Sequence, residues 1–402
     1  MTSLTAVQQT SRPAAPHRRA LTLEIVRDEE GFLALEPFWD VLVEQMATRS
    51  PFLRWDWVSL WWQNCRREGS SLVIASLQDE EGVPHAIAPL MLAREDDRAR
   101  HYLTALTFLS GFGSAHGERL DFIVPAGSED ELSPRLCRVF KLLRSECDVV
   151  RLNHLPEESP NTPHILAALE ESFIHSGVLN RYACHCIRLP DHSDHYDNRH
   201  TGAWRSKLRR RRKALDDRHA GAVTLAGERV PHRDGMRALH DLHAMQWAAD
   251  VSSFIKPASW RFHQRLAEKW LPQDRSLLPL LEADGRIIAA MYGFVERDEF
   301  FQFQMGWDPA FARLSPGKLV MRWCIECSIR RGLRIHDMLP SEYEYKRQWC
   351  DSLRWLLDVE AFNAASWRAA AFHSLRTARR LFPRRPKGNA GPTTDLQEES
   401  TA

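Results

Sequence analysis

The order of helix-like and strand-like segments between residues 234 and 339 constrains the fold of this chain more than any other feature of its sequence. Three strand-like runs follow two segments of helical apolar spacing, and only two residues separate neighbouring runs. The first of these links is Asp284-Gly285, and links this short join antiparallel strands. We expect helices at 234–249 and 258–270, strands at 277–283, 286–296 and 299–307, a helix at 316–331 and a strand at 333–339. This order predicts an α/β (α+β) fold, a mixed, mainly antiparallel sheet flanked by helices.

The first half of the chain has a similar order of segments. We expect helices at 37–47 and 55–66, strands at 72–78, 83–93 and 101–109, a helix at 129–145 and a strand at 148–153. The halves share this pattern without letter-by-letter identity, and 402 residues suit two domains better than one. We therefore predict an N-terminal lobe at 21–190, a C-terminal lobe at 191–362 and a C-terminal helix at 363–382. The polar ends, 1–20 and 383–402, are expected to be a disordered leader and tail.

Composition excludes several classes of function. The formal net charge is only +1, so any anion-binding site must come from a local cluster of basic residues, and we expect no DNA partner. No apolar run approaches the roughly 20 residues that span a bilayer, and the N-terminal segment lacks the apolar stretch of a secretory signal. We therefore expect a cytoplasmic protein.

The cysteines argue against both disulfides and a metal. There are eight, and their sparse, irregular spacing fits reduced thiols better than a disulfide framework. Two close pairs, Cys184 with Cys186 and Cys324 with Cys327, lack the regular motif of a zinc site. Burial of small side chains explains them better, so we expect no metal ion.

The segment from Arg313 to Val320 is the best candidate for an anion site. Ser315 is a suitable helix N-cap, Pro316 suits the first helical position, and Gly317 removes the side chain where a ligand would approach. The first-turn amides could then bind an anion. Lys318 supports this interpretation, because a cation in the first turn opposes the helix dipole unless a phosphate is bound there. An ordinary capped helix with a solvent-facing lysine is the alternative.

With these residues identified, the chain resembles GNAT-superfamily acetyltransferases of the cellulose-biosynthesis-type and FemAB-like family. The resemblance rests on a Ser-Pro-Gly turn that opens a helix, a Gly before a strand that ends in Asp, and a following Tyr-Lys pair. These features correspond to Ser315, Pro316, Gly317, Gly332, Asp337, Tyr345 and Lys346, and the basic helix near 205–213 and the phrase SPFLRWDWVSLWW are also similar. The likeness covers most of residues 35–350 and implies tandem GNAT-like domains.

The resemblance implies an acyltransferase that moves an acyl group from acetyl-CoA or another acyl-CoA to an amine or hydroxyl. A cell-envelope or polysaccharide precursor is the implied acceptor. The turn would hold the pyrophosphate of coenzyme A, and the candidate residues for binding it are Arg313, Ser315, Gly317, Lys318 and Leu319. Two alternatives stay open: FemAB-like transfer of an aminoacyl group from charged tRNA, and a non-catalytic GNAT-fold partner of an envelope-polymer assembly.

Three residues are candidates for the chemistry, which needs a positioned nucleophile, a route for its proton and donors to the carbonyl oxygen. Asp337, at the end of a predicted strand, could accept or relay the proton. Tyr345 and Lys346 could stabilise charge or orient the acceptor. A salt bridge between Asp337 and Lys346 that joins strand to helix is the structural alternative.

Seven basic residues lie between positions 205 and 213. We expect an amphipathic helix that presents Arg205, Arg209 and Arg212 to a phosphate-bearing acceptor or to tRNA, and we add Trp247 as a fourth candidate for substrate binding. The alternative is a solvated face that Asp216 and Asp217 partly neutralise.

The segment from Ala364 to Phe382 mixes aromatic residues and leucines with arginines. This composition suits a helix that lies on anionic lipid, which would bring the protein to the inner face of the membrane as a peripheral partner. A helix packed against the second lobe explains the same spacing.

Overall fold

The computed structural model describes residues 20–94, 102–111, 115–247, 252–340 and 344–381. The strands are β1 (Thr22–Val26), β2 (Ser71–Leu72), β3 (Ile74–Gln78), β4 (Pro84–Ala88), β5 (Leu90–Arg94), β6 (Thr104–Phe108), β7 (Val149–Pro156), β8 (Ile174–Arg188), β9 (Gly221–Leu225), β10 (Ser276–Leu277), β11 (Pro279–Ala283), β12 (Arg286–Glu296), β13 (Glu299–Trp307), β14 (Ile335–Pro340) and β15 (Ser352–Phe362). The α-helices are α1 (Glu29–Ala34), α2 (Glu36–Gln45), α3 (Trp55–Cys65), α4 (Glu129–Leu142), α5 (Thr162–Ser172), α6 (Ser193–Asp197), α7 (Gly202–Arg218), α8 (His232–Ala244), α9 (Pro257–Trp270), α10 (Pro316–Arg330) and α11 (Trp367–Leu381). Short 3-10 turns that matter below are η1 (Pro51–Leu53), η4 (Pro309–Leu314) and η5 (Glu344–Gln348).

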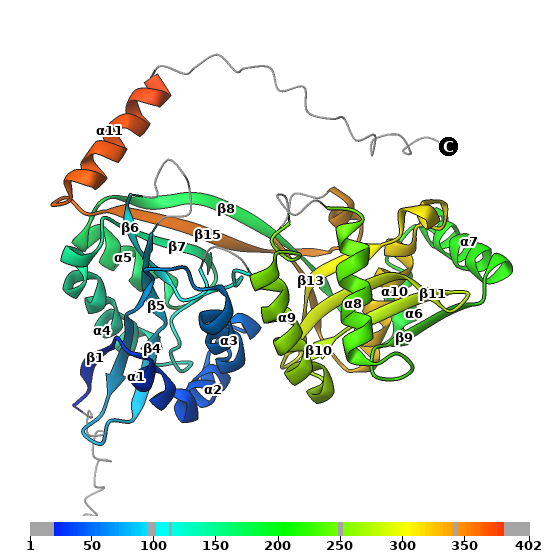
Figure 1. The fold of residues 1–402 in the computed structure, drawn as a ribbon, viewed down its shortest axis with the longest axis horizontal. Coiled ribbons are helices and arrows are strands. Elements are labelled where there is room, and N and C mark those ends of the chain that lie inside the picture. The colour runs from blue at the N-terminus through cyan, green and yellow to red at the C-terminus, as the bar shows by residue number, and fades with distance from the viewer. Residues whose placement is uncertain (1–19, 95–101, 112–114, 248–251, 341–343, 382–402) are drawn as a thin grey trace, which may run out of the picture.

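The strands form one large and one small sheet (Figure 1). The large sheet has 12 strands in the order β2-β5-β6-β7-β15-β8-β14-β13-β12-β11-β9, with β10 paired to β12, and the small sheet is β1-β3-β4. Among the described strands, β6 with β7 and β13 with β14 are parallel pairs, and the other pairs are antiparallel. The predicted fold class, a mixed and mainly antiparallel sheet flanked by helices, is confirmed.

The same unit occurs twice along the chain. In the first lobe, β5 pairs antiparallel with β6, and α4 then leads to β7, which is parallel to β6. In the second lobe, β12 pairs antiparallel with β13, and α10 leads to β14, which is parallel to β13. The repeated order of segments predicted from the sequence is therefore a repeated order in space.

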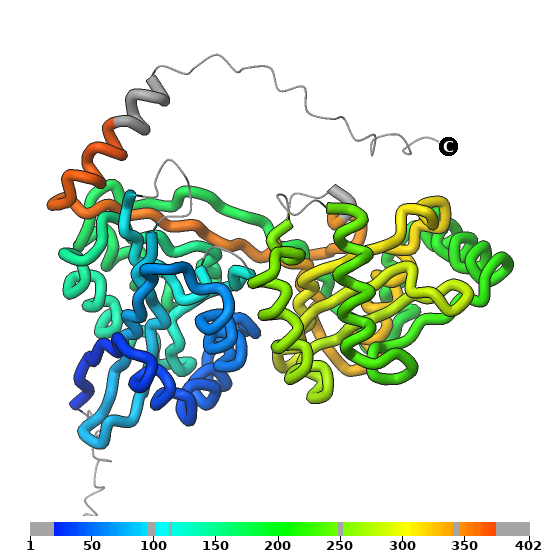
Figure 2. Tube along the Cα trace, viewed as in Figure 1, coloured from blue at the N-terminus to red at the C-terminus, as the bar shows by residue number. Residues whose placement is uncertain are grey.

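Two long strands join the lobes into a single sheet. β8 and β15 pair from Ile174↔Phe362 to Cys186↔Ser352, and both traces run side by side across the molecule (Figure 2). One end of β8 pairs with β14 of the second lobe, whereas the far end of β15 pairs with β7 of the first. The division of the chain at residue 190 stays a proposal, since one sheet continues through it.

Local sequence explains why α10 begins and ends where it does. Pro316 takes the first helical position, where its missing N–H is no loss. Gly332 follows the helix with a φ of +71°, a conformation that glycine adopts without strain. The Gly332 amide donates to Ile329 O and the Leu333 amide to Ser328 O, so that the last carbonyls are satisfied.

One predicted strand is two strands in the structure. The run 83–93 was expected to be continuous, but β4 and β5 belong to different sheets and Pro89 separates them. Proline lacks the amide hydrogen that a continuous ladder would need at this position. The expected leader and tail lie outside the described residues, except for residue 20.

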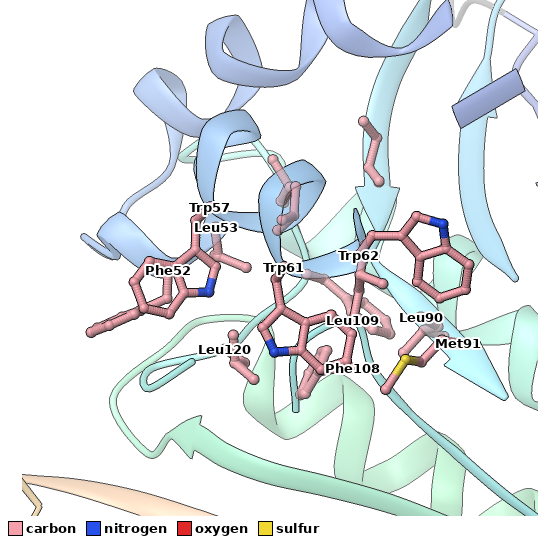
Figure 3. Packing of buried hydrophobic residues seen from close by; sticks show 14 of the residues in the cluster. Phe52, Leu53, Trp57, Trp61, Trp62, Leu90, Met91, Phe108, Leu109 and Leu120 are labelled. Atoms are coloured by element: carbon pink, nitrogen blue, oxygen red, sulfur yellow. The ribbon is translucent and has the colours of Figure 1, made fainter. Parts of the chain in front are cut away.

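Aromatic packing holds the first lobe against the second. Figure 3 shows the residues of η1 and α3, including Phe52 and Trp57, which lie together at one end of the cluster. The Phe52 and Trp57 rings each contact Phe294 of β12, with centroids 5.7 and 5.4 Å apart. Beside them, Arg54 Nε donates to Glu296 Oε2 at 2.7 Å, and both side chains are buried. The segment SPFLRWDWVSLWW therefore lies at the interface between the lobes.

Candidate active site

The second lobe contains an opening where β13 and β14 diverge. The parallel ladder between them joins Glu299 to Ile335, Phe300 to His336 and Phe301 to Asp337. Past this point β14 shifts register against β8, and Leu339 takes a φ of +55°. Because the strands no longer pair, a cavity of about 520 Å³ lies between their ends.

Four parts of the chain line this cavity. β13 and β14 form its sides, the end of α8 with its following loop and α9 cover it, a loop of the first lobe closes one end, and η5 contributes Lys346. The lining residues are Ala115, His116, Glu118, His243, Gln246, Trp247, Ser252, Ser253, Phe254, Ser259, His263, Gln302, Phe303, Gln304, Met305, Trp307, Met338, Leu339, Pro340 and Lys346. The wall combines aromatic and aliphatic side chains with histidine, glutamine, serine, glutamate and lysine side chains, and a small-molecule site needs both kinds of group.

Two side chains near the C-terminal end of α8, His243 and Gln246, hold the backbone of β13 beside the cavity. His243 Nδ1 donates to Met305 O at 3.1 Å, and Gln246 Oε1 accepts from the Trp307 amide at 3.1 Å. His243 Nε2 lies 2.8 Å from Ser252 Oγ and accepts its hydrogen. Burial lowers the pKa of His243, so the ring is neutral and suits this arrangement. These contacts fix the strand edge that a bound molecule would meet.

Lys346 lies at the other side of the cavity, where η5 returns to the end of β14. Its Nζ donates to the carbonyl oxygens of Met338 and Leu339, and the side chain is 5% exposed. Burial lowers its pKa to about 8, although the negative charge of Asp337 opposes this effect. An ammonium group has three donors, so one remains for a molecule in the cavity.

Asp337 lies behind the cavity and is absent from its described wall. The residue is fully buried, and its Oδ1 accepts from the Leu339 amide at 2.8 Å. Its charged partner is Arg354 of β15, with Nη1 3.7 Å from Oδ2, so the direct salt bridge to Lys346 considered above is not formed. Burial raises the pKa of Asp337, against the opposing charges of Arg119 and Arg354. The side chain of the third candidate, Tyr345, lies outside the described residues.

The turn before α10 differs from the prediction at Ser315. This residue has φ +50° and ψ +57°, and its side chain makes no capping hydrogen bond. The reason is that Ser315 also ends η4, where its amide donates to Ala312 O, and the left-handed conformation that turns the chain is incompatible with the extended backbone of a side-chain cap. The Lys318 and Leu319 amides both point at Ser315 O, at 3.0 and 3.3 Å.

Gly317 contacts the wall of the cavity. A Cβ atom at this position would lie 3.3 Å from Trp307 Cδ1 and 3.5 Å from Met305 Cε. Trp307 and Met305 both line the cavity, so the turn lies directly behind them. Arg313 is exposed at the start of the same turn.

The predicted basic residues surround a second cavity. It has a volume of about 560 Å³ between α6, α7 and α10, and Arg205, Arg209, Arg212 and Leu319 line it together with Asp194, Asp197, Asn198, Trp204, Leu208, Arg322, Trp323 and Glu326. Arg212 pairs with Asp216 at 2.9 Å, as the solvated-face alternative expected. Trp247 lines the first cavity, so the structure separates it from the three arginines.

The contribution of the first lobe to this cavity was not predicted from the sequence. His116 and Glu118 reach the first cavity from the loop that follows β6, and His154 of β7 lies against Glu118. His116 and Glu118 lie in the segment GFGSAHGERLDFIVPAG, for which the sequence analysis makes no prediction. A histidine and a glutamate among glycines and other small residues were the available signal, but nothing in the sequence pairs them with His154.

Comparison with known proteins finds a family similarity in the second lobe. Residues 203–347 match the family described as an acetyltransferase (GNAT) domain. The crystal structure of FemX is similar in fold, with 9% identity, 87% of this chain and 98% of that chain covered, and a TM-score of 0.55. A conserved protein of unknown function from Bacteroides thetaiotaomicron VPI-5482 is also similar, with 11% identity, coverage of 85% and 100%, and a TM-score of 0.50. A comparison with curated proteins finds no match.

Proposed function

We propose that this protein transfers an acyl group from acyl-CoA to an amine or hydroxyl in the cavity between β13 and β14. The observation that carries the proposal is the opening of a parallel strand pair within the GNAT-type domain, with the α10 turn directly behind it. An extended thioester arm fits such a cleft, because the strand ends supply backbone groups and the walls exclude water.

Lys346 is the candidate catalytic residue. Two of its donors hold the end of β14, and the third is available for the carbonyl oxygen of the thioester. A donor aimed at the oxygen on which negative charge develops stabilises the transition state more than the ground state. A pKa near 8 keeps Lys346 largely protonated at neutral pH, as this role requires.

Asp337 is a positioning residue in this scheme. Its carboxylate holds the Leu339 amide, and this contact fixes the left-handed turn whose carbonyls bind Lys346. Loss of the carboxylate would therefore act through Lys346. A conservative Asp337→Asn change retains an acceptor for the Leu339 amide and should preserve more activity than Asp337→Ala.

The donor's phosphates belong at the turn from Arg313 to Leu319 in this proposal. Arg313 and Lys318 supply positive charge there, and Leu319 reaches the second cavity, whose Arg209 is exposed on α7. A single donor could then run from the first cavity past the turn toward the second. The phosphate contacts would add binding energy that is independent of the reacting group.

Calorimetry with acetyl-CoA and longer acyl-CoA species tests the donor. We expect binding by the wild type and at least a tenfold weaker association in Gly317→Glu, because a carboxylate would meet Trp307 and repel the phosphates. Gly202→Glu is the matched control, since a Cβ atom there meets no atom within 4 Å. No heat with any acyl-CoA, or equal binding by Gly317→Glu, would refute the proposal.

We propose a cell-envelope or polysaccharide precursor as the acceptor, and only the sequence resemblance supports this choice. The cavity itself admits a neutral or polar acceptor, because Gln302, Gln304 and Ser252 face it together with apolar groups. Mass spectrometry of molecules that co-purify with the protein is the direct test. Recovery of an unrelated acceptor, such as a free amino acid, would remove the envelope assignment.

Transfer of an aminoacyl group from charged tRNA is the second candidate. The fold similarity to FemX and the arginines of α7 beside the second cavity favour it. Binding of tRNA should then weaken steeply as salt rises, because neutralised phosphates release counterions. Charge reversal at Arg209 should reduce the slope of that dependence, and tRNA binding without salt dependence would exclude this candidate.

A further inference from the structure

The first-lobe end of the cavity holds three metal-ligating side chains in close proximity. His116, Glu118 and His154 place one nitrogen or oxygen each within 4.8 Å of one another. His154 Nδ1 lies 2.6 Å from Glu118 Oε2, and His116 Nε2 lies 3.5 Å from Glu118 Oε1. Ligand atoms around a tetrahedral zinc ion are about 3.3 Å apart, so the His154–Glu118 pair would open by about 0.7 Å and the widest separation would close by up to about 1.5 Å.

The backbone brings these residues together from two separate segments. His154 lies in β7 with a φ of +57°, and its carbonyl accepts from the Leu120 amide at 3.1 Å. Gly117, between the other two ligands, permits the close approach, because a Cβ atom there would lie 2.9 Å from Leu120 and 3.2 Å from Phe52. The loop is therefore packed tightly enough to hold His116 and Glu118 in place.

A short ion pair lies at the centre of the cluster. Glu118 Oε2 is buried, and His154 Nδ1 lies 2.6 Å from it and 3.3 Å from Gly117 O. A metal ion bound here would take the place of the proton that this pair shares, because histidine must be deprotonated to act as a ligand.

The surroundings of the cluster also suit a positive ion. Asp358 Oδ1 accepts from the His154 amide at 3.1 Å, and Tyr182 donates to Asp358 Oδ2 at 2.9 Å. Asp358 therefore fixes the backbone of His154 and adds a negative charge beside it.

We propose that His116, Glu118 and His154 bind one divalent transition-metal ion, for which Zn²⁺ is the best match. Two imidazoles and one carboxylate are a donor set that Zn²⁺ accepts, and three protein ligands leave a coordination position open. His116 and Glu118 line the first cavity, so the open position faces the space in which the proposed transfer takes place. An oxygen of the acceptor, such as a carboxylate or hydroxyl, is the group that would occupy it. This site does not depend on the proposed function, because metal binding is measured without any substrate.

Metal titration of the untagged, metal-free chain tests the proposal. We expect one Zn²⁺ per chain in competition with a chromophoric chelator, and at least a 100-fold loss of affinity in both Glu118→Gln and His154→Gln. His85→Gln is the matched control, because His85 pairs with Asp79 at 2.8 Å in the small sheet, away from the cavity. No stoichiometric binding by the wild type, or equal affinity in the variants, would overturn the site and leave an ordinary ion pair.

The wild-type chain provides a test that needs no substitution, should either variant fail to fold. Diethylpyrocarbonate modification, read out by mass spectrometry, should be suppressed by Zn²⁺ at His116 and His154 and be unchanged at His85 and His164. Equal protection at all four histidines, or none at His116 and His154, would count against the site.

Discussion

The two parallel strand pairs of this protein occupy the same position in their lobes but differ in what lies beyond them. In the first lobe the chain after β6 folds back into the opening, where Asn153 donates to Gly111 O at 3.2 Å and the Leu120 amide donates to His154 O. In the second lobe, the residues of η4 are not among those that line the cavity, and the space between β13 and β14 stays open. The duplication thus supplies two potential clefts, and a loop fills one of them.

The residues at matching positions of the ladders show how the lobes diverged. The middle ladder pair contains Val150 in the first lobe and the fully buried His336 in the second. The third ladder pair contains Arg151 in the first lobe and Asp337 in the second. Arg151 pairs with Glu360 and Asp337 pairs with Arg354, and both partners lie on β15. The first lobe keeps an apolar strand and a closed ion pair, whereas the second places polar groups beside an open cavity.

Replacement of Lys346 should show the functional difference between the two lobes most clearly. We expect Lys346→Met to lower acyl transfer by about 1,000-fold, because the cavity would lose its candidate donor to the carbonyl oxygen. The matched change in the first lobe is Lys141→Met on the exposed face of α4, and it should leave activity unchanged. Steady-state kinetics and thermal melting of both variants measure this difference. Comparable activity in the two would remove Lys346 from the mechanism.

Acid should destabilise the second lobe through His336. Burial lowers the pKa of His336 to about 3, so between pH 6.5 and 3 the unfolded chain binds a proton that the folded chain does not. Stability therefore falls as pH falls through this window, by up to about 1.4 kcal/mol per pH unit from this group. In His336→Val, which introduces the residue of the matching first-lobe position, urea unfolding should show a shallower loss from pH 6 to pH 4. Parallel pH profiles for the two proteins would contradict this assignment.

The loop after β6, which fills the opening of the first lobe, should contribute to stability and not to activity. Asn153→Ala removes a hydrogen bond to Gly111 O, and we expect it to lower the free energy of unfolding by about 1 kcal/mol. Acyl transfer should stay within about twofold of the wild type. Chemical denaturation and steady-state kinetics on one preparation measure the stability and the activity of this variant. A large loss of activity without a loss of stability would make the loop after β6 part of the catalytic site.

The smallest effect is expected outside both lobes. Helix α11 projects away from the sheet (Figure 1), and Trp367 at its start is 75% exposed. We propose that this helix contacts anionic membrane, and no helix among the described residues has the length and apolarity to cross one. Trp367→Ser should lower sedimentation with anionic vesicles about threefold, whereas Leu142→Ser on α4 should not. Equal binding to zwitterionic vesicles would exclude the membrane contact.

Local sequence patterns predicted the consecutive antiparallel strands of the second lobe, but they did not predict the pairing of segments that are distant in the sequence. β12 and β13 have the bounds that their apolar runs and two-residue links predicted. β8 and β15 were not predicted, because much of β8 is exposed and polar and its pairing is set by a strand more than 150 residues away. The same holds for the site, since Lys346 was identified from its motif but the approach of Glu118 to His154 depends on how the first lobe folds.

The position of β15 near the C-terminal end of the chain has a consequence for folding during translation. Residues 352–362 complete the sheet of the first lobe beside β7 and extend beside β8 toward the second. The earlier half therefore cannot finish folding when its own residues have emerged from the exit tunnel, and it must wait until almost the whole chain has been translated. Truncation before residue 352 would leave the edges of β7 and β8 exposed, so neither half is a self-sufficient fragment for expression.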